Sequence, residues 1–205
     1  MIPTVAECFQ LMDRYLMLDN IRDHSIIVAR VSALLVEESI KAGGNLSVAL
    51  TVTAALLHDI GKTACLNNDH DHAVLGREIC LEHGFTELAE IVADHVLFQN
   101  GSLSTVAENE IVYYADKRVN HDKIVSLAAR EEYIAERYGN NDPLRLEAIG
   151  RNCQKWQEVE KTLFAALPFS PKDVSSLIDP DPATCDMYLE VIPEAVDRVD
   201  GVSPE

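Results

Sequence analysis

The feature that most constrains the fold is an apolar run from Thr53 to Leu57 that ends in His58 and Asp59. Because this run leaves no polar face, we expect it to form a helix that is buried on all sides. Burying an unpaired carboxylate is costly, so Asp59 needs a cation, a hydrogen-bond network or a metal ion as its partner. The chain must therefore fold so that other elements bring such a partner to the end of this helix.

Apolar residues recur at helical spacing along nearly the whole chain, and no segment shows a convincing alternation of apolar and polar residues. The pattern predicts an all-α protein. Polar caps and glycine or proline stops put the expected helices at residues 4–17, 21–41, 47–59, 72–82, 86–98, 108–120, 127–139 and 143–167. We expect one helical domain over residues 1–167, with its functional core at about 20–167.

The composition changes after Pro168, where proline and acidic residues become frequent. Such a segment buries too little apolar surface to build a core of its own. We therefore expect residues 168–205 to be an acidic C-terminal appendage, partly disordered or with a short helix at about 184–191.

Composition also excludes several classes of function. The formal net charge of −17 argues against a nucleic-acid polymer as partner, whereas a few local cations or metals could still bind a small phosphorylated substrate. The sequence has neither an apolar run of about 18 residues nor a basic N-terminal region followed by an apolar one, so we expect no membrane span, no secretory signal and a cytoplasmic location. The five cysteines are scattered, as is typical of reduced thiols. Composition leaves the oligomeric state open.

Sites inside a helical bundle are built from side chains that project inward, so their residues should share a helical face with apolar neighbours. His24, His72 and His95 meet this condition, and Asp116 is a carboxylate on an otherwise apolar face. The other three histidines are expected at the surface or at a helix end where the macrodipole explains them: His70, His121 and His83.

Six residues therefore form the candidate metal site: His24, His58, Asp59, His72, His95 and Asp116. Imidazole and carboxylate ligands suit iron, manganese, zinc or nickel. Six of them could hold two ions, with one carboxylate bridging the pair.

These residues, and above all the string HDIGK from His58 to Lys62, resemble the HD-domain metal-dependent phosphohydrolase superfamily. The resemblance spans roughly residues 22–119 and implies an HD-type helical bundle. The signature metal ligands that it implies are His24, His58, Asp59 and Asp116. His72 in HAVLG and His95 in ADHV match the extra histidines of dinuclear members, in which the Asp of the HD pair bridges two divalent ions. The resemblance implies iron or manganese, with zinc, nickel or magnesium as alternatives.

The order of the segments, including YYADK around Asp116, is most similar to the branch related to symmetrical dinucleoside tetraphosphate hydrolases. No GYP motif follows His95, which argues against cyclic di-GMP hydrolysis. Lys62 and Thr63 stand where alarmone hydrolases carry Glu-Asp, which argues against that activity. The acid that branches specialised for nucleoside monophosphates usually place near the HD pair is also missing.

The resemblance implies a phosphohydrolase in which a metal-bound water attacks a phosphoester or phosphoanhydride of a small, nucleotide-like substrate. Asp59 would bridge the ions, and Lys62 would contact a substrate phosphate as a point charge close to the reaction. Lys117, beside Asp116, is the second expected substrate-binding residue, ahead of Arg118. Two alternatives stay open: a di-iron oxygenase with a similar ligand set, and a non-catalytic regulatory HD module.

Overall fold

The computed structural model describes residues 1–96 and 106–178, and these residues are almost entirely helical. The all-α prediction is confirmed. The helices are α1 (Val5–Arg14), α2 (Asp19–Lys41), α3 (Val48–Leu57), α4 (Lys62–Cys65), α5 (His72–Glu82), α6 (Thr86–Asp94), α7 (Glu108–Lys117), α8 (Leu127–Tyr138), α9 (Pro143–Phe164), the 3-10 turn η1 (Pro171–Asp173) and α10 (Val174–Leu177).

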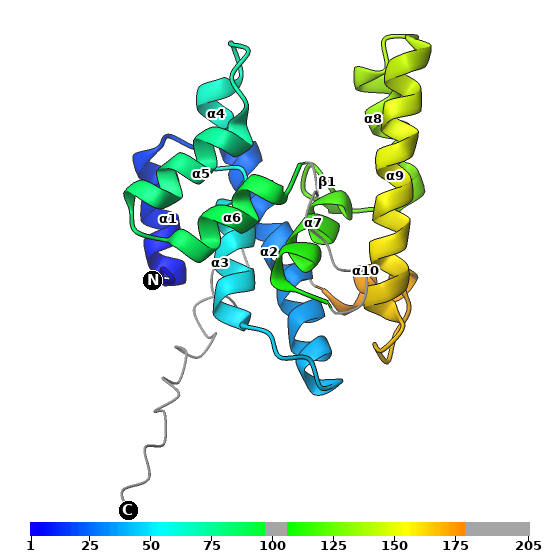
Figure 1. Ribbon diagram of the computed structural model, residues 1–205, viewed down its shortest axis with the longest axis horizontal. Helices are drawn as coiled ribbons and strands as arrows, with labels where there is room; N and C mark the ends of the chain where they lie inside the picture. Colours follow the sequence, from blue (N-terminus) through cyan, green and yellow to red (C-terminus); the bar gives the residue numbers. More distant parts are fainter. Residues whose placement is uncertain (97–105, 179–205) are drawn as a thin grey trace, which may run out of the picture.

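Helices α2 and α3 form the centre of the bundle and pack along each other (Figure 1). Helix α3 is buried on all sides from Thr51 to Leu57, as its apolar sequence predicts. Helix α7 packs against both α2 and α3, and α6 covers α3 from another side. The α8–α9 hairpin lies beside α7 at the edge of the bundle (Figure 1). The end of α3 is therefore enclosed by helices from several parts of the chain.

A two-stranded antiparallel ribbon follows α7 and was not predicted. Strand β1 (Val119–Asn120) pairs with β2 (Lys123–Ile124), with Val119 opposite Ile124. The helix predicted over 108–120 therefore ends at Lys117. Strands of two residues are too short to show an alternating pattern, which explains why periodicity missed them.

The turn after α3 requires Gly61 because another helix approaches it closely. A Cβ at this position would lie 2.5 Å from the carbonyl oxygen of His72 and 2.9 Å from the amide nitrogen of Gly76. Both are backbone atoms of α5, which cannot give way as the end of a flexible side chain can. Gly61 thus allows α5 to lie directly against the turn that carries Asp59.

We expect Gly61→Ala to lower the free energy of unfolding by about 1 to 3 kcal/mol, the usual cost of overpacking. Gly150→Ala is the matched control, since a Cβ there meets nothing within 4 Å in the middle of α9. Because alanine is more favourable than glycine inside a helix, that variant should be more stable than the wild type by about 0.5 to 1 kcal/mol. Urea unfolding followed by circular dichroism measures both, and equal stability of the two variants would contradict the close approach.

The first part of the expected appendage packs onto the bundle. Val174 is fully buried, Ile178 is 8% exposed, and Arg118 donates a hydrogen bond to the carbonyl of Pro171. The boundary at residue 167 stays a prediction, but Val174 and Ile178 beyond it belong to the core of the domain. The helix expected at about 184–191 lies outside the described residues, as do residues 97 and 98 of the predicted fifth helix.

Within residues 1–96 and 106–178, no helix has the length and apolar character that crossing a bilayer requires.

Candidate metal centre

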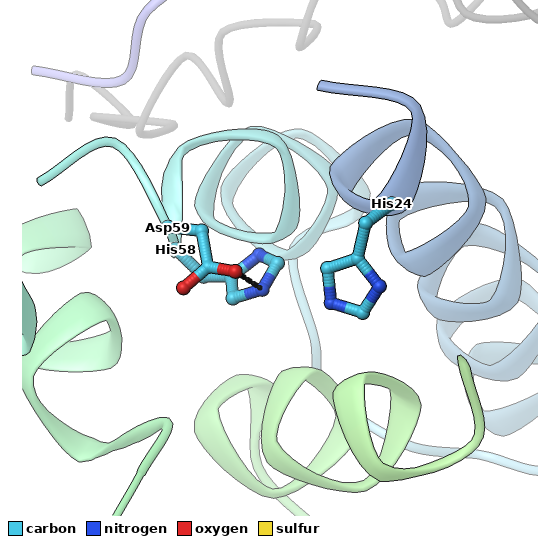
Figure 2. Close-up of side chains that lie close together, drawn as sticks. All are labelled: His24, His58 and Asp59. Carbon is cyan, nitrogen blue, oxygen red and sulfur yellow. Dashed lines mark ion pairs between the residues drawn. The ribbon is translucent and has the colours of Figure 1, made fainter. Parts of the chain in front are cut away.

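The end of α3 is the meeting point of the six residues predicted from the sequence. His58 is the C-cap of α3 and Asp59 follows it, while His24 comes from the first turns of α2 and Asp116 from the last turn of α7. His72 is the first residue of α5, and His95 is the C-cap of α6. Figure 2 shows His24 on one helix facing His58 and Asp59 on the other. All six are buried except His72, whose side chain is 27% exposed.

The first group of ligand atoms lies between α2, α3 and α7. His58 Nε2 lies 3.4 Å from Asp59 Oδ2 and 3.8 Å from Asp116 Oδ1, and His24 Nε2 lies 3.0 Å from the same Asp116 oxygen. Ligand atoms of His24, His58 and Asp59 all fall within 4.8 Å of one another. This spacing suits coordination of a single ion.

The second group lies between α3, α5 and α6. Asp59 Oδ1 lies 3.3 Å from His72 Nε2 and 3.5 Å from His95 Nε2, and the two imidazole nitrogens are 3.2 Å apart. Asp59 is thus common to both groups, with one oxygen toward His58 and the other toward His72 and His95. A carboxylate in this position can bridge two ions.

Hydrogen bonds on the far side of the rings fix which imidazole nitrogen faces the centre. The Nδ1 atoms of His24, His58 and His95 lie 2.9, 2.7 and 2.6 Å from backbone carbonyl oxygens. Because a carbonyl only accepts, each Nδ1 carries the proton and donates it. In the neutral rings, Nε2 therefore presents a lone pair to the centre, as a metal ligand requires.

Two buried atoms at the centre have no hydrogen-bond partner among the described residues: His58 Nε2 and Asp59 Oδ1. Leaving such atoms unsatisfied costs free energy, and a divalent cation satisfies both a nitrogen lone pair and a carboxylate oxygen. The residues present therefore fit a metal centre.

The charge state of the carboxyls also suits a cation. Burial alone would raise the pKa of Asp59, but the imidazoles around it outweigh burial and hold that pKa well below its ordinary value. The pKa of Asp116 is likewise lowered against the effect of burial, chiefly by the Lys117 ammonium. Burial lowers the pKa of His95, which favours its neutral form. At neutral pH the centre is therefore built from anionic carboxylates and at least one neutral imidazole.

Lys62 lies at the edge of the centre and reaches open space. Its Nζ donates to Asp59 Oδ2 at 2.7 Å, and its side chain is 40% exposed. Burial lowers the pKa of Lys62, but attraction to Asp59 and Asp116 outweighs burial and raises that pKa. Lys62 also lines a cavity of about 250 Å³ that His24 and Asp59 border. The contact of Lys62 with a substrate phosphate stays a prediction.

Lys117 and Arg118 lie behind the centre, and the substrate contacts expected of them do not fit this geometry. Lys117 is buried, and its ammonium donates to Asp116 Oδ2 and, at 3.0 Å, to the carbonyl of His95. Arg118 is also buried and donates to the carbonyls of Val125 and Pro171. Helix α7 is enclosed over its last two turns, so neighbours of Asp116 turn toward protein instead of solvent. Lys117 is suited to position Asp116.

Two contributors to the centre were missed. His121, predicted at the surface, has an exposed side chain, but its backbone carbonyl accepts from His24 Nδ1. The residue type does not indicate what a backbone carbonyl will contact, although a φ of 57° at His121 marks a tight turn there.

Arg130 was also missed: its Nη2 lies 3.9 Å from Asp116 Oδ1, and it lines the cavity. The spacing of Arg130, Tyr133 and Arg137 along one helix could have singled it out.

Comparisons with known proteins identify the domain family of the chain. The HD domain family model matches residues 21–132, more than half of the 205-residue chain. Ribonuclease Y of Treponema denticola is 27% identical over 171 residues, which cover 79% of this chain and 32% of that protein. Ribonuclease Y of Pseudothermotoga lettingae is 28% identical over 152 residues, which cover 69% of this chain and 28% of that protein.

The chain thus spans about a third or less of these curated relatives. No solved structure is a significant match. The matched region contains all six converging residues, and the chain belongs to the HD domain superfamily of metal-dependent phosphohydrolases.

Proposed function

We propose that the chain hydrolyses a phosphoester or phosphoanhydride bond of a small, nucleotide-like substrate at a dinuclear metal centre. The observation that carries the proposal is the shared Asp59 carboxylate, whose two oxygens face two separate groups of ligand atoms. His24, His58, Asp59 and Asp116 would hold one ion, and Asp59, His72 and His95 the other. Iron or manganese is the first choice, with zinc, nickel or magnesium as alternatives.

Two bound ions would supply a nucleophile by lowering the pKa of water toward about 7 and would neutralise charge on the phosphoryl oxygens. The protein holds the ligands ready for this. The carbonyls behind His24, His58 and His95 fix the ring orientation, and Lys117 fixes Asp116. Lys62 pairs with Asp59 and lines the cavity, so its ammonium is suited to bind the phosphate that reacts.

An RNA phosphodiester is a second candidate substrate, because both relatives are named ribonuclease Y. The formal net charge of −17 opposes it, since binding a long polyanion depends on displacing counterions with a basic surface. A small substrate needs only the local cations of the cavity. We therefore favour the small substrate and include RNA in the test.

The test is product formation by the purified full chain from nucleotides, dinucleoside polyphosphates and an RNA oligonucleotide, with Mn²⁺ or Fe²⁺ and without oxygen. We expect hydrolysis of a small nucleotide that EDTA abolishes. Cleavage of RNA alone would overturn the choice of substrate. No hydrolysis of any compound, together with oxygen consumption when air is then admitted to the iron-loaded protein in a separate measurement, would assign a di-iron oxygenase. Neither reaction with any metal would leave a non-catalytic regulatory module.

A further inference from the structure

The cavity beside the metal centre has a second wall, which the HD ligands do not explain. Helix α8 lines this wall with five residues: Arg130, Tyr133, Ile134, Arg137 and Tyr138. They recur at intervals of three and four residues and therefore form one face of the helix. We call these five residues the α8 face.

Four of the five residues of the α8 face lie outside the hydrophobic core, and only Ile134 packs against it. Leu127, at the start of α8, is the only buried residue of that helix. Tyr138 is 56% exposed, and Tyr133 and Ile134 are partly exposed. Two tyrosines on one exposed face therefore need a reason other than core packing.

Charge is sorted along α8. The acidic residues of the helix are Glu131, Glu132 and Glu136, and none of them is among the residues that line the cavity. Arg130 and Arg137 do line it, together with Lys62 of α4. In a chain with a formal net charge of −17, cations gathered in one cavity indicate an anionic ligand.

Arg130 connects the α8 face to the metal centre. Its Nη1 donates to Asn120 Oδ1 at 3.0 Å, and its Nη2 lies 3.9 Å from Asp116 Oδ1. Its Nε is buried and has no hydrogen-bond partner in the described part of the chain. A guanidinium held in this way can donate to a phosphate that lies at the centre.

The tyrosines continue from Arg130 away from the centre. The ring of Tyr133 lies edge-on to His121 at a centroid distance of 5.4 Å, and the guanidinium of Arg130 lies 5.8 Å from the Tyr133 centroid. Arg137 lies 5.8 Å from the centroid of Tyr138. From residue 130 to residue 138 the helix rises by about 12 Å. This length leaves room for a sugar and a base beyond a phosphate at Arg130.

We propose that the α8 face binds the nucleoside part of a nucleotide, with a phosphate between Lys62 and Arg130 and the base against Tyr133 and Tyr138. The inference rests on the proposed function, because it takes the metal centre as the place where the phosphate reacts. It adds that the substrate carries an aromatic base. A sugar phosphate, in contrast, would leave the rings of both tyrosines without a contact to the ligand.

A binding measurement tests this inference independently of catalysis. Isothermal titration of the full chain in EDTA, and again with Mn²⁺, compares AMP with ribose 5-phosphate, which lacks the base. Base stacking should make AMP bind about tenfold more tightly than ribose 5-phosphate. Tyr138→Leu and Tyr133→Leu should reduce this preference to about onefold to threefold, whereas Tyr138→Phe, which retains the ring, should keep it.

Arg130→Gln tests the phosphate contact and should weaken the binding of AMP and of ribose 5-phosphate by a similar factor, about tenfold. Arg145→Gln is the matched control, since Arg145 is exposed on α9 and is not one of the residues that line the cavity. Circular dichroism melts show that each variant is folded. Equal affinity of the wild type for the two phosphates, or a full base preference in both leucine variants, would overturn the inference.

The outcomes also separate the two proposals. A base preference, with no hydrolysis in the presence of any metal ion, would support the role proposed for the α8 face and overturn the proposed function. Hydrolysis without a base preference would support the proposed function and overturn the role of the α8 face. A short oligoadenylate distinguishes the source of the nucleotide: affinity no greater than that of AMP assigns a free nucleotide, and much greater affinity assigns a nucleotide within RNA.

Discussion

Asp59→Asn is expected to abolish metal-dependent hydrolysis, with kcat/KM lowered by at least about 1000-fold, beyond the 10- to 100-fold typical of residues behind the ligands. Asparagine keeps the shape of the side chain but not its charge, and its nitrogen is no ligand. Since Asp59 faces both groups of imidazoles, the change weakens both ion sites at once. The assay is the one that detects hydrolysis by the wild type, at saturating Mn²⁺.

Asp69→Asn is the control for this prediction, because Asp69 is an exposed carboxylate in the loop between α4 and α5. It should keep the wild-type rate. A thermal melt in EDTA shows whether Asp59→Asn is folded. His72→Gln changes a partly exposed residue of the centre and should lower kcat/KM by at least about tenfold. Activity above a tenth of the wild-type rate in folded Asp59→Asn would contradict a bridging role.

Arg118→Met is expected to destabilise the fold by about 3 kcal/mol or more, as is usual when one partner of a buried charge network is removed. Arg118 is 4% exposed and joins distant segments. Its nitrogens donate to the carbonyl of Val125 at 2.6 Å, to that of Pro171 at 2.9 Å and to the hydroxyl of Tyr114. It also lies 3.6 Å from Glu160 Oε2. Methionine fills part of the space but leaves these acceptors unpaired.

Urea unfolding measures this effect, with Arg151→Met as control. Arg151 is an exposed residue of α9 whose pair with Glu147 spans one helical turn, so its loss should change the free energy of unfolding by less than about 0.5 kcal/mol. A change of less than about 1 kcal/mol for Arg118→Met would show that the network contributes little. A large change would show that the network is a main contributor to the stability of the fold.

The helical architecture and the six residues of the centre could be predicted because both leave a mark in the sequence. Side chains that form a site inside a helical bundle must project inward, so His24, His72, His95 and Asp116 lie on apolar faces that periodicity detects. The order of these residues along the chain then matches a known superfamily. Tertiary contacts only had to bring the faces together.

What the sequence did not reveal depends on contacts that residue type does not encode. Lys117, ahead of Arg118, is expected from the sequence to contact a substrate, and only the enclosure of α7 shows that both are buried donors. The role of His121 belongs to its backbone carbonyl. The strands of the ribbon after α7 and the single turn α4 are too short for a periodic pattern to repeat. The residues of the α8 face form a helical stripe in the sequence, but only the structure shows that they border a cavity.

The central claim is that one carboxylate, Asp59, joins two metal sites. Equilibrium dialysis of the full chain against Mn²⁺ without oxygen, with metal counted by mass spectrometry, tests it most directly. The structure predicts two ions per wild-type chain and a loss of tight binding at both sites in Asp59→Asn. A wild-type chain that binds a single ion, or an Asp59→Asn chain that still binds two tightly, would contradict it.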